Sequence, residues 1–533
     1  MKICIAQQNY HIGNFEQNTE KILGAIEAAK NQGADLILFS EMSVCGYPAR
    51  DFVEFEDFIN KCYQSIDAIK QAADTIGVLI GSPARNPNKK GKDLYNAAFF
   101  LYEQKVVAEI HKTLLPTYDV FDENRYFENG SEIGDFKIDI DGTDFNCVVQ
   151  ICEDLWEDNY SRKLSEEIVT MSPDLIVNIS ASPYHKNRKN IRKDLIVRNF
   201  GDANCPFVYC NLIGGQDELI FDGNSMVFNS DMNLIAEGKN FEEDLIIVDT
   251  DSSLINESEV EINNEIYSAL TLGIKDYFSK TGHQKAVIGL SGGIDSALVA
   301  CLAVDALGSE NVYLVSMPSR FSSEHSKTDA KQLAQNLNAH FDTVDIDSLF
   351  EKYLDVLNPK FKGLESNVAE ENIQSRIRGN ILMALSNKFG CLVLSTGNKT
   401  ELALGYCTLY GDMSGGLSAI GDSSKTEVYN LAKWKNKVSN NIIPDSSITK
   451  PPSAELAPNQ VDPFDYDLIS PIVDKIVLGE DISKDVADTD LSDIVTRINH
   501  NEHKRRQAAP VLRISKKAFG IGRRVPIVNH FDE

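Results

Sequence analysis

The stretch AVIGLSGGIDS, residues 286–296, has the residue types and spacing of a phosphate-binding turn. Its first five residues are apolar and predict a short buried strand. Ser291, Gly292 and Gly293 form the turn, after which a helix opens at Asp295 and Ser296 and stops at Gly308. Two adjacent glycines let the backbone approach a ligand closely, and the positive end of a helix dipole favours an anion. The stretch is not a Walker A loop, because its spacing differs and no lysine follows the turn.

Two interpretations of this turn are open from the residues alone. One is a structural glycine turn whose helix is capped by Asp295 or Ser296. The other follows from the pattern S-G-G-I-D-S, which resembles the pyrophosphate loop of ATP pyrophosphatases, enzymes that release pyrophosphate and leave AMP on the substrate. This resemblance implies that Asp295 helps to hold Mg²⁺. It also implies that ATP is bound by Leu290, Ser291, Gly292, Gly293, Ile294, Asp295 and Ser296.

Three residues with reactive side chains end predicted strands in the first half of the chain: Glu41, Lys112 and Cys152. Each alone has an ordinary interpretation, because a strand-end glutamate or lysine is usually solvated and most cysteines of a reduced protein are core residues. The combination favours chemistry. The stretches FSEMSVCGYP, HKTLLPTYDVFDENRYF and VQICEDLWED resemble the Glu–Lys–Cys sites of the nitrilase (carbon–nitrogen hydrolase) superfamily. They are most similar to the glutaminase domain of glutamine-dependent NAD synthetases.

The resemblance implies a role for each residue of this site. Cys152 would attack as a thiolate, which requires a base and a nearby cation. Glu41 would accept the thiol proton and later activate the hydrolytic water, and Lys112 would stabilise the oxyanion. A second carboxylate, Glu123, matches the acidic residue that accompanies this triad.

Glutamine binding is implied at Tyr118, Ser182 and Arg188. Relatives often have lysine where Arg188 stands; either side chain could bind the α-carboxylate, and arginine would do so through two parallel hydrogen bonds. A later segment, residues 209–229, resembles one that such glutaminase domains carry. It predicts a strand, a Gly-Gly turn and a second strand, with Gln216, Asp217 and Glu218 on the turn. A structural and a catalytic role for this turn both remain open.

Five stretches of the second half resemble the synthetase domain of NAD synthetases: MPSRFSSEHS, EENIQSRIRGNILMALSNKFG, STGNKTELALGYCTLYGDMSGGLSAIGDSSKTEVYNLAKW, KPPSAEL and EHKRRQAAPVLRISKKAFG. The resemblance implies ATP binding by Thr396 and Lys425, and Mg²⁺ binding by Asp295 and Glu401. It implies deamido-NAD binding by Asn372, Arg376, Glu401, His503 and Lys504. Ordinary alternatives are a solvated helix face for Arg376 and a helix N-terminal charge for Glu401.

The elements that must position these residues alternate between strands and amphipathic helices along the chain. For the first half we expect a nitrilase-like α-β-β-α sandwich, and for the second a doubly wound parallel sheet of the ATP pyrophosphatase type, with the turn of residues 291–293 at a strand's carboxyl end. The fold class is therefore α/β. The predicted domains are 1–250 and 265–533, joined by a polar, acidic linker at 251–264.

Composition limits the partners. The chain has 533 residues and a formal net charge of -27, which argues against a general nucleic-acid binder. Between His503 and Arg524, however, lie eight Lys and Arg residues and no Asp or Glu, as expected where polyphosphate ligands bind. Ten cysteines without a C-x-x-C, no signal-like segment and no apolar run of membrane length predict a cytoplasmic protein. A homo-oligomer is implied only by the resemblance.

Together these features predict a ligase that amidates deamido-NAD with ammonia from glutamine, using Mg–ATP and releasing AMP and pyrophosphate. Three other functions share some of these features. A GMP-synthetase-like amidotransferase would carry a different, triad-type glutaminase. An RNA-modifying enzyme of the same loop family would need a basic face. A non-catalytic nucleotide-binding protein would not need a competent residue at every catalytic position.

Overall fold

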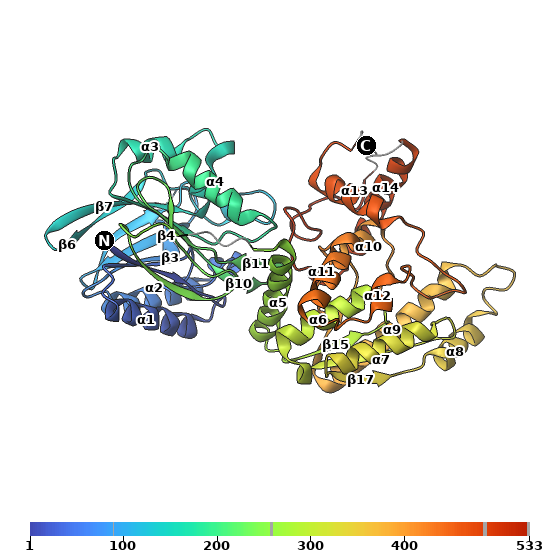
Figure 1. The fold of residues 1–533 in the computed structure, drawn as a ribbon. Coiled ribbons are helices and arrows are strands. Elements are labelled where there is room, and N and C mark those ends of the chain that lie inside the picture. Colours follow the sequence, from blue (N-terminus) through green and yellow to red (C-terminus); the bar gives the residue numbers. More distant parts are fainter. Residues whose placement is uncertain (89, 256–259, 483–487, 530–533) are drawn as a thin grey trace. The chain divides into compact units, whose positions relative to one another are not determined.

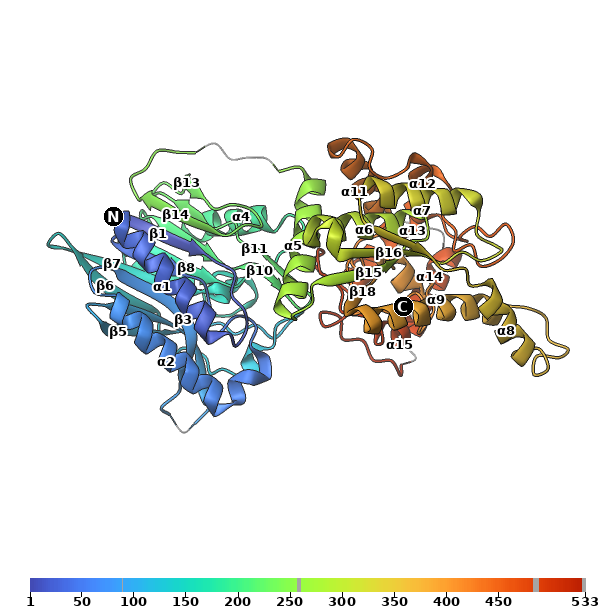
Figure 2. The same cartoon turned by 90° about the horizontal axis from the view of Figure 1, so that it is seen from below.

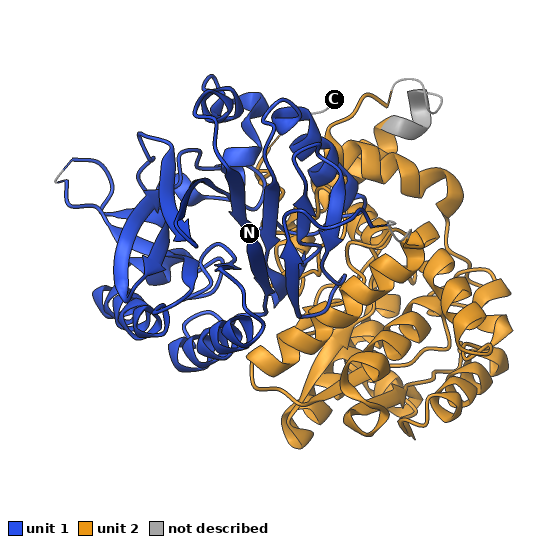
Figure 3. Cartoon of the chain, turned by 60° about the vertical axis from the view of Figure 1, so that its left-hand side comes forward, with its two compact units in different colours: residues 1–216, 220–259 blue, residues 217–219, 260–533 orange. Residues whose placement is uncertain are grey.

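The computed structural model describes residues 1–533 except 89, 256–259, 483–487 and 530–533. It divides into two compact units, Met1–Gln216 with Ile220–Glu259 and Asp217–Leu219 with Val260–Glu533 (Figure 3). No helix among the described residues is both long and apolar enough to span a bilayer.

Two mixed six-stranded sheets form the centre of unit 1 (Figures 1 and 2). The first sheet runs β14 (Asp244–Asp249), β1 (Lys2–Gln7), β2 (Leu36–Phe39), β3 (Gly77–Arg85), β4 (Leu94–Tyr102) and β5 (Lys105–His111). The second sheet runs β13 (Leu234–Glu237), β12 (Met226–Phe228), β9 (Phe207–Asn211), β8 (Leu175–Ser180), β7 (Thr143–Ile151) and β6 (Gly134–Ile140). Each has a parallel centre, β1–β2–β3 and β7–β8–β9, flanked by antiparallel strands.

The main core of unit 1 lies between the two sheets. Leu38 and Phe100 of the first sheet and Val149 and Val177 of the second belong to one buried apolar cluster. Helices cover the outer faces: α1 (Phe15–Asn31) and α2 (Glu56–Ala72) on the first sheet, and α3 (Leu164–Thr170) and α4 (Arg188–Phe200) on the second. This four-layer arrangement is the predicted α-β-β-α sandwich. It buries the strand ends that carry chemistry between two sheets, where few waters compete for polar groups.

Unit 2 is built on a parallel sheet in the order β17-β16-β15-β18-β19, which is the predicted doubly wound topology. Its strands are β15 (Lys285–Gly289), β16 (Val312–Ser316), β17 (His340–Thr343), β18 (Cys391–Ser395) and β19 (Leu417–Ser418). The order reverses between β15 and β18, and such a switch point is where open α/β sheets bind ligands.

Helices flank both faces of this sheet (Figure 2). The helices of unit 2 are α5 (Ile262–Lys280), α6 (Ile294–Leu307), α7 (Glu324–Asn336), α8 (Asp347–Leu357), α9 (Val368–Phe389), α10 (Lys399–Leu404), α11 (Lys425–Val438), α12 (Asp445–Thr449), α13 (Tyr466–Leu478), α14 (Asp488–His500) and α15 (Glu502–Arg505). Helices α8 and α9 share one apolar cluster with β15, β16 and β18. A second cluster joins α10, α13 and α14 into a smaller helical layer.

Several element ends differ from the sequence-based expectation. Helix α5 begins at Ile262, three residues earlier than predicted and inside the predicted linker, of which residues 256–259 lie outside the described part. The predicted Gly-Gly turn after β9 is wrong: Gly214 and Gly215 lie within strand β10 (Ile213–Gln216), and the turn to β11 (Leu219–Asp222) is formed by Asp217 and Glu218. A Cβ at Gly214 would lie 2.2 Å from the side-chain oxygen of Asn9, so close packing explains this glycine.

Candidate active sites

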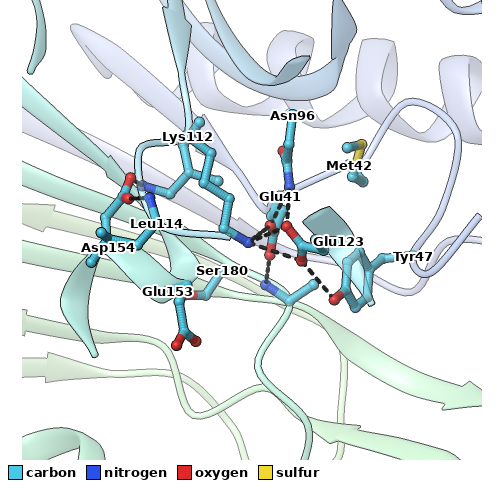
Figure 4. A network of polar contacts seen from close by, with 12 residues as sticks. Glu41, Met42, Tyr47, Asn96, Lys112, Leu114, Glu123, Glu153, Asp154 and Ser180 are labelled. Atoms are coloured by element: carbon cyan, nitrogen blue, oxygen red, sulfur yellow. Dashed lines mark hydrogen bonds and ion pairs between the residues drawn. The ribbon is translucent and has the colours of Figure 1, made fainter. Parts of the chain in front are cut away.

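A buried lysine links two carboxylates in unit 1 (Figure 4). Lys112 Nζ lies 2.7 Å from Glu41 Oε1 and 2.8 Å from Glu123 Oε2, and all three side chains are inaccessible or nearly so. Glu41 follows β2, Lys112 directly follows β5, and Glu123 begins a 3-10 turn, Glu123–Arg125. Three separate segments of the chain thus meet beyond the ends of strands of the first sheet.

Further hydrogen bonds fix both carboxylates. The Asn96 amide donates to Glu41 Oε1 at 2.7 Å and to Glu123 Oε2 at 3.2 Å, and the Tyr47 hydroxyl donates to Glu123 Oε1 at 2.9 Å. The backbone N–H of Ala181 donates to Glu41 Oε2 at 2.9 Å. Burial alone would lower the pKa of Lys112, but Glu123 and Glu41 outweigh it and raise that pKa well above its ordinary value. The lysine is therefore a permanent cation.

Cys152 stands next to this cluster, at the end of β7 on the second sheet. It begins a short 3-10 turn, Cys152–Leu155, with a positive φ of 45°, a backbone conformation that non-glycine residues adopt mainly under tertiary constraint. Burial raises the pKa of the Cys152 thiol well above its usual range; Glu41 raises it further, and Lys112 lowers it. The thiol is thus protonated at rest and needs a base before it can act as a nucleophile.

Glu153, directly after Cys152, is a site residue that the sequence prediction missed. Its side chain is buried and accepts hydrogen bonds of 3.0 Å from the hydroxyls of Tyr118 and Tyr160. Burial raises the pKa of Glu153 to about 7, although Lys112 and the two tyrosines lower it. A signal was available in the sequence, because an acidic residue adjacent to a candidate nucleophile is unlike a core residue.

The predicted glutamine-binding residues also lie near Cys152. Arg188, the first residue of α4, donates from Nη2 to Ser182 Oγ at 3.3 Å, and its guanidinium carbon lies 3.8 Å from the ring centroid of Trp156. Burial lowers the pKa of Arg188 to about 10, and the charge of Arg192 lowers it further. Arg192 is fully buried and binds both oxygens of Asp222. Within the described residues, Arg188 has no carboxylate partner.

In unit 2 the turn after β15 opens a cavity of about 290 Å³ at the switch point of the sheet. Gly292 has a φ of 82°, and a Cβ there would lie 2.2 Å from the Ser326 carbonyl oxygen, so only glycine fits. Helix α6 starts at Ile294, where no side chain caps it; Ser296 Oγ bonds back to Gly293 O instead. The alternative of a turn whose helix is capped by Asp295 or Ser296 is therefore wrong, and Ser291, Gly293 and Ile294 line the cavity at the helix start.

Most of the predicted ATP-site residues line this cavity. They are Leu290, Ser291, Gly293, Ile294, Asp295, Ser296, Thr396 and Lys425. Gly292 does not line the cavity, whereas Glu401, predicted for Mg²⁺ and deamido-NAD, does. Lys425 Nζ lies 2.5 Å from Asp295 Oδ2 and 3.4 Å from Glu401 Oε1, so one ammonium bridges two carboxylates. Burial raises the pKa of Glu401 to about 8, Lys425 lowers it, and Asp295 raises it. When both carboxyl groups are ionised, the cluster carries two negative charges against one positive charge, and this excess favours a bound cation.

Asn398 orients this pair and was not predicted. Its amide donates to Asp295 Oδ1 at 2.9 Å, and its side-chain oxygen accepts from the backbone N–H of Glu401, which caps α10. The spacing N-x-x-E is a capping-box pattern that the sequence shows openly. Among the described residues no group of three or more His, Cys, Asp or Glu side chains forms a ready metal cage. Two protein carboxylates with substrate phosphates are nonetheless a usual donor set for Mg²⁺.

The predicted deamido-NAD residues other than Glu401 do not line the cavity; three of them contact the adjacent segment, residues 405–409. Lys504 donates to the Gly405 and Cys407 carbonyls at 2.7 and 2.9 Å. Arg376 donates to the Leu409 carbonyl, and Asn372 accepts from the Thr408 hydroxyl. His503 is exposed, and its ring nitrogen lies 2.9 Å from the His500 carbonyl. Tyr406, in the middle of this segment, lines the cavity and links the two groups.

The KPPSAEL stretch forms part of the opposite cavity wall. Glu455 has a φ of 49°, and its carboxylate accepts from the hydroxyls of Ser323 and Ser326 at 2.8 and 2.7 Å, at the start of α7. Lys450 donates to the same Ser326 hydroxyl. Arg378 is half-buried in this wall and donates to the Met317 carbonyl at 2.9 Å. Its burial lowers its pKa to about 10.

Comparison with known proteins matches both units. Residues 2–259 match the carbon-nitrogen hydrolase family, and residues 266–508 match the NAD synthase family. The chain is 41% identical to a glutamine-dependent NAD(+) synthetase of Synechocystis, over 99% of both chains. It is 39% identical to one of Thermotoga maritima, over 100% of this chain and 99% of the other.

A solved structure agrees with these matches. That of a glutamine-dependent NAD+ synthetase from Acinetobacter baumannii, in complex with ADP, has 36% sequence identity and a TM-score of 0.80 over 99% of this chain and 98% of that one. A second, from Cytophaga hutchinsonii, shares the fold with a TM-score of 0.84 and 21% identity.

Proposed function

Because the chain belongs to the family of glutamine-dependent NAD(+) synthetases, we propose that it converts deamido-NAD, ATP and glutamine into NAD, AMP, pyrophosphate and glutamate. The observation that carries the proposal is the match to curated members of this family over 99% of both chains, with each unit matched by its own family model. Unit 1 supplies ammonia, and unit 2 activates the carboxylate that ammonia attacks.

In unit 1, Cys152 is the nucleophile. Glu41, held by Lys112 and the Ala181 N–H, takes the thiol proton as Sγ attacks the glutamine amide carbon. Glu41 then delivers that proton to the leaving ammonia, and the acyl group stays on Sγ as a thioester. A water activated by the same carboxylate hydrolyses the thioester to glutamate.

Lys112 stabilises the negative oxygen of each tetrahedral intermediate. Two carboxylates flank this one ammonium, so its charge is fixed and its position is set before substrate arrives. Glu123 contributes by holding Lys112 through both of its own oxygens, which leaves Glu41 free to exchange a proton without releasing the lysine.

Glutamine carries a carboxylate and an ammonium at its α-carbon, and the site offers both complements. Arg188 is a buried cation without an anionic partner among the described residues, and Ser182 stands beside it, so we assign them to the α-carboxylate. Glu153, which directly follows Cys152 and is held by Tyr118, is the acidic complement that we assign to the α-ammonium. A guanidinium matches a carboxylate with two parallel donors, which a lysine in the same place could not.

In unit 2, the nicotinate carboxylate of deamido-NAD attacks the α-phosphorus of ATP and pyrophosphate leaves. The N–H groups of residues 291–296 bind the phosphates, Lys425 offsets charge on them, and Thr396 contributes to ATP binding. Asp295 and Glu401 are the residues that would hold Mg²⁺, which when bound neutralises phosphate charge. Ammonia then attacks the carbonyl carbon of the acyl adenylate, and AMP leaves as NAD forms.

Asn372, Arg376, His503 and Lys504 are assigned to deamido-NAD. Three of them contact residues 405–409, which border the ATP cavity through Tyr406. The basic stretch from residue 503 to 524 provides local positive charge in a chain whose net charge is -27. A dinucleotide substrate carries negative phosphates and is attracted by such local positive charge. A homo-oligomeric state, a cytoplasmic location and the domain bounds 1–250, 251–264 and 265–533 stay predictions.

The test is NAD formation by the purified chain from deamido-NAD, Mg–ATP and either glutamine or ammonium chloride. Wild type should use both donors. A Cys152→Ala variant should use ammonium only, and a Cys205→Ala variant, which changes a buried cysteine distant in sequence from the site, should behave as wild type. Glutamine hydrolysis without NAD formation from either donor would mean that the acceptor substrate is misassigned. Unchanged glutamine use by Cys152→Ala would mean that the nucleophile is.

A further inference from the structure

We infer that Trp156 is a positioning residue for glutamine, which holds the face of the Arg188 guanidinium so that its N–H groups stay available for the α-carboxylate. This inference rests on the proposed function, because it takes glutamine to bind beside Cys152. Trp156 lies four residues after Cys152, between the two 3-10 turns Cys152–Leu155 and Glu157–Asn159.

The contact is a close stack of a cation on an aromatic face. The guanidinium carbon of Arg188 lies 3.8 Å from the indole centroid, well inside the range of about 6 Å over which such pairs attract. Tryptophan is the strongest partner in this interaction. Because the ring contacts the flat face of the guanidinium, the N–H donors that project from its edge are not used by the stack.

The remaining contacts of Arg188 leave donors without a strong acceptor. Ser182 Oγ lies at 3.3 Å and the His185 ring nitrogen at 3.5 Å, both at the long limit for a hydrogen bond. Among the residues that the structure describes, neither the buried Arg188 Nε nor the buried indole Nε1 of Trp156 has a hydrogen-bond partner. Buried donors without partners are rare in folded proteins, so two of them side by side indicate a ligand that carries acceptor oxygens.

The neighbouring arginine shows what Arg188 lacks. Arg192, one helical turn further along α4, binds Asp222 with two parallel hydrogen bonds of 2.8 and 2.9 Å. That carboxylate is fully engaged, so none is left for Arg188 among the described residues. The indole face is therefore the main contact that orients Arg188 before substrate arrives. A lysine ammonium has no flat face to stack, so the value of Trp156 depends on arginine at position 188.

A fluorescence titration tests whether Trp156 senses glutamine. The chain has two tryptophans, and a Trp434→Phe variant leaves Trp156 as the single indole fluorophore. Trp434 packs on Tyr267 in unit 2, so this change leaves the glutamine site intact. With Cys152→Ala added to prevent turnover, glutamine should change the emission saturably. Binding seen by calorimetry without any change in emission would overturn the inference.

Kinetics provide the second test. Trp156→Leu should raise the KM for glutamine roughly 2- to 30-fold, with kcat within about 2-fold and ammonium-driven NAD formation unchanged. Trp156→Phe, which keeps an aromatic face, should rise less. In an Arg188→Lys background, Trp156→Leu should add little further effect, because the stacked partner is already gone.

Each other result has a definite meaning. Additive effects of the two substitutions, or an equal loss of both glutamine-driven and ammonium-driven activity with a lowered melting temperature, would overturn the positioning role. Failure of the wild-type chain to hydrolyse glutamine would instead refute the proposed function on which the inference rests.

Discussion

Replacing Lys112 and Glu123 separately should affect stability very unequally, although the two side chains contact each other. The structure has two buried carboxylates sharing one ammonium, at 2.7 Å from Glu41 and 2.8 Å from Glu123. Lys112→Met removes the ammonium that both buried carboxylates share and leaves two acidic groups close together in a low-dielectric site. Breaking a buried pair in this way costs roughly 3–5 kcal/mol. For a domain of this size that corresponds to a loss of about 10 °C in melting temperature.

Glu123→Gln should cost far less. The glutamine keeps an acceptor for Lys112 and removes the repulsion from Glu41, while Lys112 remains paired. Burial and Glu41 already raise the pKa of Glu123, which means that its charge is held at an energetic cost. We expect the unfolding free energy to fall by about 1–2 kcal/mol, because the new amide N–H₂ faces the donor of Asn96 or Tyr47 where the carboxylate offered an acceptor.

The assay is thermal unfolding followed by both activities at 20 °C or below, where each variant is folded. Both variants should lose glutamine hydrolysis, Lys112→Met by at least about 100-fold because the oxyanion loses its cation, and both should keep ammonium-driven NAD formation. Equal destabilisation by the two substitutions, or a wild-type melting temperature for Lys112→Met, would refute the reasoning.

Three further predictions concern single residues of the two sites. Burial raises the pKa of Glu153 from 4.5 to about 7, so the folded chain binds that proton more tightly than the unfolded chain, and a stability penalty of about 3 kcal/mol develops as pH rises from 4.5 through 7. Glu153→Gln should therefore gain stability relative to wild type between pH 5 and 8 in urea unfolding, and a constant difference would contradict this. Lys425→Met should lower NAD formation from both nitrogen donors by about 100-fold or more, whereas Lys437→Met on the exposed face of the same helix should not, as steady-state rates will show. Gly292→Ala should lower the melting temperature by several degrees, because its φ of 82° and a Cβ at 2.2 Å from Ser326 O both oppose it, and Gly293→Ala, with its nearest atom at 3.3 Å, should melt close to wild type.

Much of the fold was readable in the sequence because its signals are local. Apolar runs of five to nine residues separated by amphipathic helices predicted the strands of both units, and the resemblance assigned one fold to each half. One predicted strand ends at the reactive residue Cys152, and another ends at the glycine-containing turn of residues 291–293. Element ends were less certain: α5 starts inside the predicted linker, and the glycines 214–215 lie in a strand.

The conformation of Gly214 shows why such misreadings occur. A Gly-Gly pair is a turn signal in isolation, but here Asn9 approaches so closely that no side chain fits. That contact joins residues about 200 positions apart, so no local pattern contains it. The same holds for the missing cap at α6, where residue types that suit capping instead line a cavity.

The sequence by itself determined where reactive side chains follow strands, at Glu41, Lys112 and Cys152, and the resemblance pointed to Asp295 and Glu401 in the other unit. Side-chain chemistry and strand periodicity are properties of short segments, so they survive without a structure. Only the tertiary structure decided that one lysine serves two carboxylates and that Arg188 rests on Trp156. Charge balance, burial and stacking depend on which segments distant in the sequence come into contact. Tertiary packing decides those contacts.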